Sequence, residues 1–274
     1  MGITLPLTLL LTLLLTLLLT GCGPGVDPGE GGRGILPDCT PQDDGQLSRD
    51  ELPLAPGVVS TLVRNHPGQP VEGLPGPAEG VDRDFSEGPE DRGATFALVD
   101  PSQAWWADRF PTATHAAPSS VDLPDLLGVY RADEEALWLL GLITAEPPDP
   151  AQATEIHYDE PVAVLQLPLI PGLSWGQTAT WRDGVVAGLP NQGVEDWSFE
   201  VGDVESARLP GGAELSEVLP VDVRLRQDFA LSVGAPGVIT HRRIWFAGCF
   251  GEVASVSSGD PDYATIDEYR RLLP

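Results

Sequence analysis

The chain of 274 residues contains no lysine, so its 15 basic side chains other than histidine are all arginines, against 41 acidic side chains. The net charge of −26 repels the phosphates of nucleic acids, and we therefore expect no nucleic-acid partner. It also excludes a polybasic attachment to anionic lipid. The acidic residues are spread along the chain, which is typical of a solvated surface.

Sequence patterns for cofactors and metals are also missing. The glycine-rich segments lack the following lysine of a phosphate-binding loop. No histidine belongs to an H-E-x-x-H motif or to an i, i+4 pair, so no zinc site is predicted. We expect no cofactor and no enzymatic activity. The four histidines are His66, His115, His157 and His241.

Two short segments are candidates for a catalytic site. Residues 172–176 fit G-x-S-x-G, but Pro168 and Pro171 interrupt the approach and the following residues favour a strand, whereas a nucleophile elbow needs a helix there. We therefore interpret Ser174 as part of a turn. His157 precedes Asp159 and Glu160, which makes it a weak acid or base candidate.

Cysteine is scarce, and the first of three closes an apolar segment, Ile3 to Thr20. The stretch Leu19-Thr20-Gly21-Cys22 resembles the lipobox of bacterial lipoproteins. The resemblance implies that residues 1–21 are a signal peptide and that Cys22 receives a diacylglyceryl group and acyl chains such as palmitate. A membrane span is the alternative, disfavoured because no basic cluster follows it. The segment departs from the usual signal by lacking Lys and Arg before Cys22.

The other two cysteines, Cys39 and Cys249, would lie in an exported chain, where oxidising conditions favour pairing. We predict a disulfide between them; two buried thiols are the alternative. Such a bond would connect the start of the mature protein to its last strands.

Residues 22–36 are rich in glycine and proline and are predicted to form a flexible tether. Residues 37–56 form an acidic segment that resembles the second half of an EF-hand loop, with Asp44, Ser48 and Glu51 at ligand positions. Thr40 and Gln42 replace the leading acidic ligands of that motif. These residues are a weak calcium candidate, and a tight acidic turn beside Cys39 is the favoured interpretation.

Residues 57–274 are predicted to form a β-rich domain, because short apolar or alternating runs recur between turn residues. We expect a mainly β fold, an antiparallel sandwich or half-barrel with long Pro/Gly-rich loops. A hairpin is favoured around residues 132–135. One short C-terminal helix is predicted over residues 266–273, from apolar residues at i, i+3, i+6 and i+7. Pro161, Pro168 and Pro171 are expected to flank strands without entering them.

Tryptophan is the notable aromatic residue, with core packing as the default. Trp105-Trp106 is the expected exception, because adjacent strand residues face opposite sides, and one ring would then face outward or into a cavity. Such exposed rings can form sugar-binding platforms.

Between residues 160 and 257 the chain resembles β-rich bacterial lipoproteins, through Leu167-Pro168-Leu169, Gly172-Leu173-Ser174-Trp175, the VDVR run at 221–224, and the stretch from Ile244-Trp245-Phe246 to Val253. The resemblance implies a curved antiparallel sheet without a known activity, similar in outline to half-barrel lipoprotein carriers. The sequence thus predicts a non-enzymatic binding or structural module, lipid-anchored in the cell envelope at the outer membrane, with an envelope protein or a glycan as partner. A half-barrel lipid or lipoprotein carrier and a hydrolase are the alternatives.

Overall fold

The computed structural model describes residues 39–274, apart from residues 67, 90, 121–122, 147–148 and 230–236. The predicted signal peptide, the lipidation residue Cys22 and the tether at 22–36 lie outside the described residues. Among the described residues, no helix has both the length and the apolar character needed to cross a bilayer.

The protein is mainly β, as predicted. Its strands are β1 (Val59–Asn65), β2 (Val71–Glu72), β3 (Arg83–Asp84), β4 (Asp91–Ala97), β5 (His115–Ser120), β6 (Leu123–Ala132), β7 (Ala136–Thr144), β8 (Glu155–Gln166), β9 (Ser174–Val186), β10 (Leu189–Val201), β11 (Glu205–Arg208), β12 (Glu214–Phe229), β13 (Val238–Ala247), β14 (Gly251–Ser258), β15 (Thr265–Ile266) and β16 (Glu268–Leu272). Short 3-10 turns lie at η1 (Arg49–Glu51), η2 (Pro101–Gln103), η3 (Ala107–Arg109) and η4 (Pro210–Gly212).

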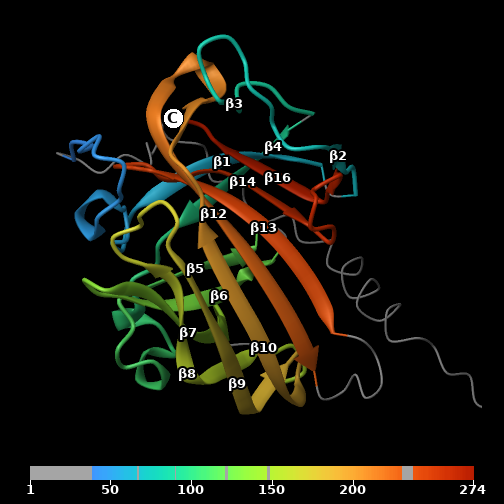
Figure 1. The fold of residues 1–274 in the computed structure, drawn as a ribbon. Coiled ribbons are helices and arrows are strands. Elements are labelled where there is room, and N and C mark those ends of the chain that lie inside the picture. The colour runs from blue at the N-terminus through green and yellow to red at the C-terminus, as the bar shows by residue number, and fades with distance from the viewer. Residues whose placement is uncertain (1–38, 67, 90, 121–122, 147–148, 230–236) are drawn as a thin grey trace, which may run out of the picture.

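One large sheet, antiparallel along its main path, forms the body of the protein. Along that path the strand order is β4-β1-β16-β14-β13-β12-β10-β9-β8-β7-β6-β5. The sheet curves so that its two ends, near β4 and β5, come together. There Val99, just after β4, exchanges two backbone hydrogen bonds with Ala116 of β5, at 2.7 and 3.0 Å. Figure 1 shows the long strands β9, β10, β12 and β13 crossing the front, with β5 to β8 to the left of β9 and β10. The result is a nearly closed half-barrel.

The sheet has an inner and an outer face. Phe199 of β10 lies opposite Trp175 of β9 and Val223 of β12, and these side chains face the interior, where they belong to or pack against the largest apolar cluster. Residues 39–52 fill one end of this interior, because Leu47 and Leu52 are buried in the same cluster and Leu47 exchanges backbone hydrogen bonds with Leu169.

A second apolar cluster packs against β13, β14 and β16 beneath the segment around β3. Phe85, just after β3, is fully buried and packs edge-on against the ring of Trp245, with ring centroids 5.1 Å apart. β3 pairs with β11 in parallel, and the backbone N–H of Phe85 donates to Arg208 O at 2.8 Å. The proline-rich stretch before β4 is thus held on the outside of the sheet.

The predicted C-terminal helix is wrong. Residues 268–272 form strand β16, which pairs with β1 on one side and β14 on the other. An amphipathic helix with this apolar spacing would leave Arg270 and Arg271 on its solvated face, whereas the structure buries both. Arg270 binds Glu268 at 2.8 Å, and Arg271 donates to Phe85 O at 3.1 Å, a partner that the local sequence does not reveal.

The prediction that Pro161 would flank a strand is also wrong, because Pro161 lies inside β8. The β7–β8 register shifts there: Leu139 pairs with Val162 and Gly141 with His157, so the residues between are unpaired with β7. A proline fits at such an irregularity since it has no N–H to contribute. The hairpin predicted around residues 132–135 is confirmed, with Asp133 accepting the backbone N–H of Glu135 and Ala136 at 3.0 Å.

The structure joins Cys39 to Cys249 by a disulfide across 210 residues of sequence, as predicted. The backbone N–H of Cys249 also donates to Glu51 O at 2.7 Å. The first described residues are therefore fixed to the turn between β13 and β14 at two points.

We expect the double variant Cys39→Ser/Cys249→Ser to unfold more easily than the parent. A loop of this length stabilises a fold by about 3 to 5 kcal/mol when the bond restricts the unfolded chain. Urea unfolding of both proteins without reductant measures the difference. Equal unfolding midpoints, or a parent that titrates two free thiols under native conditions, would contradict the prediction.

Candidate functional site

The acidic turn at residues 40–51 uses its carboxylates to hold itself together. Glu51 is 4% exposed and accepts the backbone N–H of Gln42 and Ser48 at 3.0 Å and the Ser48 hydroxyl at 2.9 Å. Asp44 accepts the backbone N–H of Gln46 at 3.0 Å. Protein donors thus occupy two of the three weak calcium candidates, Asp44 and Glu51, and the third, Ser48, gives its hydroxyl to Glu51. Among the described residues, no group of three or more metal-ligating side chains comes together.

Ser174 and His241 do not form a nucleophile and base pair. Ser174 opens strand β9, so a strand follows it in place of the helix of a nucleophile elbow. His241 lies on β13, and β10 and β12 separate the two strands. Three strand spacings amount to roughly 14 Å, well beyond hydrogen-bonding distance.

The candidate acid or base His157 also lacks the expected neighbours. Its exposed ring stacks on Phe110, with centroids 4.3 Å apart, and its Nε2 lies 2.9 Å from Glu155. Asp159 instead accepts the Thr180 hydroxyl at 2.7 Å. The intervening Tyr158 points inward and donates to buried Glu195 at 2.7 Å.

Trp105 and Trp106 lie between η2 and η3, not in a strand, so the alternation argument for an outward ring does not apply. Trp106 is 1% exposed and packs against Phe110. Trp105 is partly buried, donates to Ala145 O at 3.0 Å and is covered by the Arg109 guanidinium 4.6 Å from its ring. The expected exposed platform is therefore not formed.

A groove of about 540 Å³ lies on the outer face of the central strands. Side chains along a strand point alternately to the two faces of the sheet. Phe199 and Val223 face inward, so their neighbours Glu200 and Arg224 face outward and line the groove. The loop after β14 provides a wall. The residues that line this outer groove are Ser174, Trp175, Ser198, Phe199, Glu200, Asp222, Val223, Arg224, His241, Arg243, Pro261 and Tyr263.

One ion pair holds the side chains at the end of the outer groove that lies nearest to Tyr263. Arg243 of β13 lies opposite Asp222 of β12 and donates two hydrogen bonds to its carboxylate, at 2.7 and 2.6 Å. These bonds raise the pKa of Arg243. The Tyr263 hydroxyl approaches the same carboxylate at 3.4 Å, and burial raises the pKa of Tyr263. Arg243, Asp222 and Tyr263 therefore contact one another at this end of the groove.

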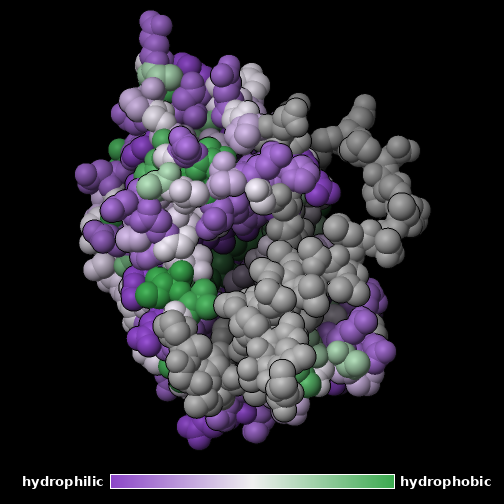
Figure 2. Space-filling view, turned by 90° about the vertical axis from the view of Figure 1, so that its right-hand side faces the viewer, coloured by the Kyte–Doolittle hydropathy of each residue, from purple (hydrophilic) through white to green (hydrophobic). Residues whose placement is uncertain are grey.

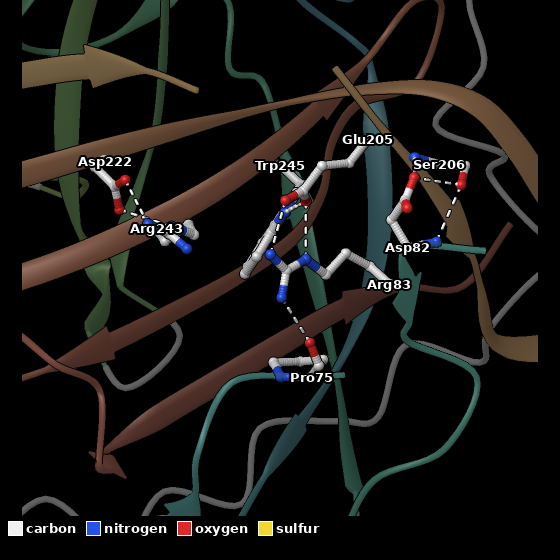
Figure 3. Close-up of polar contacts among 8 residues, drawn as sticks. All are labelled: Pro75, Asp82, Arg83, Glu205, Ser206, Asp222, Arg243 and Trp245. Carbon is white, nitrogen blue, oxygen red and sulfur yellow. Dashed lines mark hydrogen bonds and ion pairs between the residues drawn. The ribbon is translucent and has the colours of Figure 1, made fainter. Parts of the chain in front are cut away.

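A second set of polar contacts holds the β3 segment beside the Asp222–Arg243 ion pair, as Figure 3 shows. Arg83 donates to both oxygens of Glu205, at 2.9 and 2.7 Å, and to Pro75 O at 3.0 Å. Trp245 Nε1 donates to Glu205 at 2.8 Å. Asp82 accepts the backbone N–H and hydroxyl of Ser206, and the backbone hydrogen bond is the main cause of its lowered pKa.

Three other polar side chains of the outer groove have no partner among the described residues. Arg224 and Glu200 are exposed and His241 is half-buried, and within the described part of the chain none of the three makes a hydrogen bond or an ion pair. Arg224 lies opposite His241 on β13 and opposite Ser198 on β10. Glu200 lies opposite Ser174 and Asp222. The groove thus has a basic side and an acidic, hydroxyl-bearing side.

Sequence reasoning did not single out Arg224 or Glu200. The alternation of residues 221–226 indicates a strand with polar outward residues, but nothing in it shows which strands lie beside it. Because the groove takes its residues from four strands, its composition depends on a register that one sequence does not reveal.

The inner face also carries polar groups. Glu195, 3% exposed, accepts hydrogen bonds from Tyr158, Trp197 and Gln227 at 2.7, 3.0 and 2.7 Å. Towards β14 and β16, Arg242 binds Glu252 at 3.1 Å and Arg270 binds Glu268. Figure 2 shows a hollow in the middle of one face, and the coloured surface around it is mostly hydrophilic with small hydrophobic patches.

His115 is the most perturbed histidine of the described chain. It is 2% exposed, stacks on Tyr130 with centroids 5.4 Å apart, and has Nδ1 3.0 Å from the Thr114 hydroxyl. Burial, with a smaller contribution from Arg49, lowers the pKa of His115 to about 4. The imidazole is therefore neutral in the folded protein at neutral pH.

We expect stability to fall as the pH drops from about 6.5 to about 4, because the unfolded chain binds a proton at His115 in this range and the folded chain does not. In His115→Gln this contribution, at most about 3 kcal/mol, should be lost. Urea unfolding at pH 7 and pH 5 measures it, with His157→Gln at an exposed histidine as the control. An unchanged pH dependence in His115→Gln would show that the buried imidazole does not contribute.

Comparison with known proteins identifies no family. No family model matches the chain, and no curated protein matches it. Among solved structures, a Bacteroides fragilis protein described as exported, with a YmcC-like fold, aligns over 80% of this chain and 96% of its own length, at 11% identity and a TM-score of 0.25. A similarity this weak establishes neither a shared fold nor a shared function, so the chain is interpreted from its own residues.

Proposed function

We propose that this protein is an exported lipoprotein, anchored in the cell envelope through an acylated Cys22, whose half-barrel domain is a non-enzymatic binding module. The observation that carries the binding role is the outer groove, in which Arg224, His241 and Glu200 have no partner among the residues that the structure describes. Strand pairing fixes the backbone positions of these residues, and no described protein group competes with a ligand for their side chains.

Two features support export. The apolar segment Ile3 to Thr20 ends in the lipobox-like Leu19-Thr20-Gly21-Cys22. The Cys39–Cys249 disulfide belongs to a chain that folds in an oxidising compartment, because cytosolic thiols are kept reduced. Both features fit an outer-membrane lipoprotein whose domain lies in the envelope.

Charge explains why the acyl chains would be the only anchor. With a net charge of −26 and no lysine, the domain gains nothing from anionic headgroups. Two acyl signals suffice for stable anchoring without a protein surface that contacts lipid. The partner would then be a glycan or an envelope protein reached from the membrane surface.

The inner face argues against the carrier alternative. An acyl chain needs an apolar lining, whereas this interior holds the buried carboxylate of Glu195 and the charged pair Arg242 and Glu252. Leu47 and Leu52 also fill one end of it. The separation of Ser174 from His241 argues against the hydrolase alternative.

We expect Cys22→Ala to abolish labelling by radioactive palmitate in a bacterial host and to move the protein from the membrane to the soluble fraction, because only Cys22 offers an acceptor thiol after a lipobox. The double variant Cys39→Ser/Cys249→Ser is the matched control and should keep its label. A Cys22→Ala protein that stays labelled, or a mature parent chain beginning at Met1, would contradict the lipoprotein assignment.

A further inference from the structure

The outer groove is bipolar, with a cation on one side and a carboxylate and hydroxyls on the other. We propose that it binds a short acidic saccharide, whose carboxylate lies on Arg224 and His241 and whose hydroxyls lie on Glu200, Ser198 and Ser174. This inference rests on the proposed binding role of the groove and adds the chemical class of the ligand.

The basic side of the groove selects a carboxylate. Two arginines line the groove. Arg243 already donates two hydrogen bonds to Asp222, and its guanidinium lies 5.7 Å from the Tyr263 ring centroid. Arg224 keeps all its donors, and a planar guanidinium matches a carboxylate through two parallel hydrogen bonds. His241, directly opposite on β13, adds a further nitrogen to the same place.

The acidic side of the groove suits hydroxyl groups. Glu200 lies opposite Ser174 on β9 and one diagonal step from Arg224, roughly 7 to 8 Å away at this position in a sheet. A carboxylate accepts hydrogen bonds from sugar hydroxyls, and serine hydroxyls both donate and accept them. A carboxylate and a set of hydroxyls at this separation fit the two ends of one or two sugar rings.

The size and the outward side chains of the groove favour a small polar ligand. A volume of about 540 Å³ lies in the range of small-molecule sites. The aromatic rings beneath the groove, those of Trp175 and Phe199, stack on each other on the inner face, with centroids 4.8 Å apart. The outward-facing side chains of the groove therefore offer mainly hydrogen bonds and charge.

The charge of the whole domain limits the length of the ligand. A net charge of −26 repels a long polyanion, whereas a saccharide with few carboxylates is attracted at short range by Arg224. We therefore expect short acidic saccharides to bind better than long ones.

The test is isothermal titration calorimetry of the full-length protein in detergent with trigalacturonate. We expect binding that Arg224→Gln weakens about tenfold or more and Glu200→Gln about threefold or more. Arg226→Gln is the matched control: Arg226 lies on the same face of β12, outside the groove, and is paired with Asp228 at 3.1 Å. It should change the affinity less than about twofold. The neutral methyl ester of trigalacturonate should not bind measurably.

Three results would overturn the inference. Equal affinity of the methyl ester would exclude recognition of the carboxylate, and equal effects of Arg224→Gln and Arg226→Gln would exclude the groove. If glycylglutamate binds in an Arg224-dependent way and trigalacturonate does not, the groove is a binding site but the saccharide class is wrong. The Cys22→Ala experiment tests anchoring separately, so failure of one proposal is not mistaken for failure of the other.

Discussion

Backbone hydrogen bonds between β12 and its neighbours β10 and β13 fix which side chains face the interior and which line the groove. Val221 and Val223 pack into the interior. The alternate residues of the same strand, Asp222 and Arg224, face outward. A shift of one residue in this register would place two charged groups in the apolar cluster and expose two valines. The core and the candidate site therefore depend on the same pairing, and neither can change without the other.

The strand periodicity of residues 94–256 was sufficient to predict a β domain and most of its strands. It was not sufficient for their lengths: Pro161 was expected to end a strand, whereas β8 continues through it from Glu155 to Gln166. Nor did it predict β16, where buried arginines gave a helical pattern. In both cases the deciding partners, such as Phe85 for Arg271, are remote in sequence, and a local pattern carries no information about them.

The candidate site was less predictable than the fold for the same reason. Every motif weighed from the sequence was contiguous, such as the G-x-S-x-G segment and the acidic turn around Glu51. The groove residues Glu200, Arg224 and His241 come from three strands. What marks them is the absence of a partner, a property that exists only once neighbouring strands are placed. Asp222, by contrast, is neutralised by Arg243 although it lies next to Glu200.

The disulfide has a mechanical consequence. Cys39 is bonded to Cys249 in the turn between β13 and β14, so tension applied through the preceding residues enters the molecule at that turn. The intervening segment, with Leu47 and Leu52 seated in the interior, bears none of this load. Force applied at the amino-terminal end would therefore reach the β13–β14 turn directly, without first pulling Leu47 and Leu52 out of the interior.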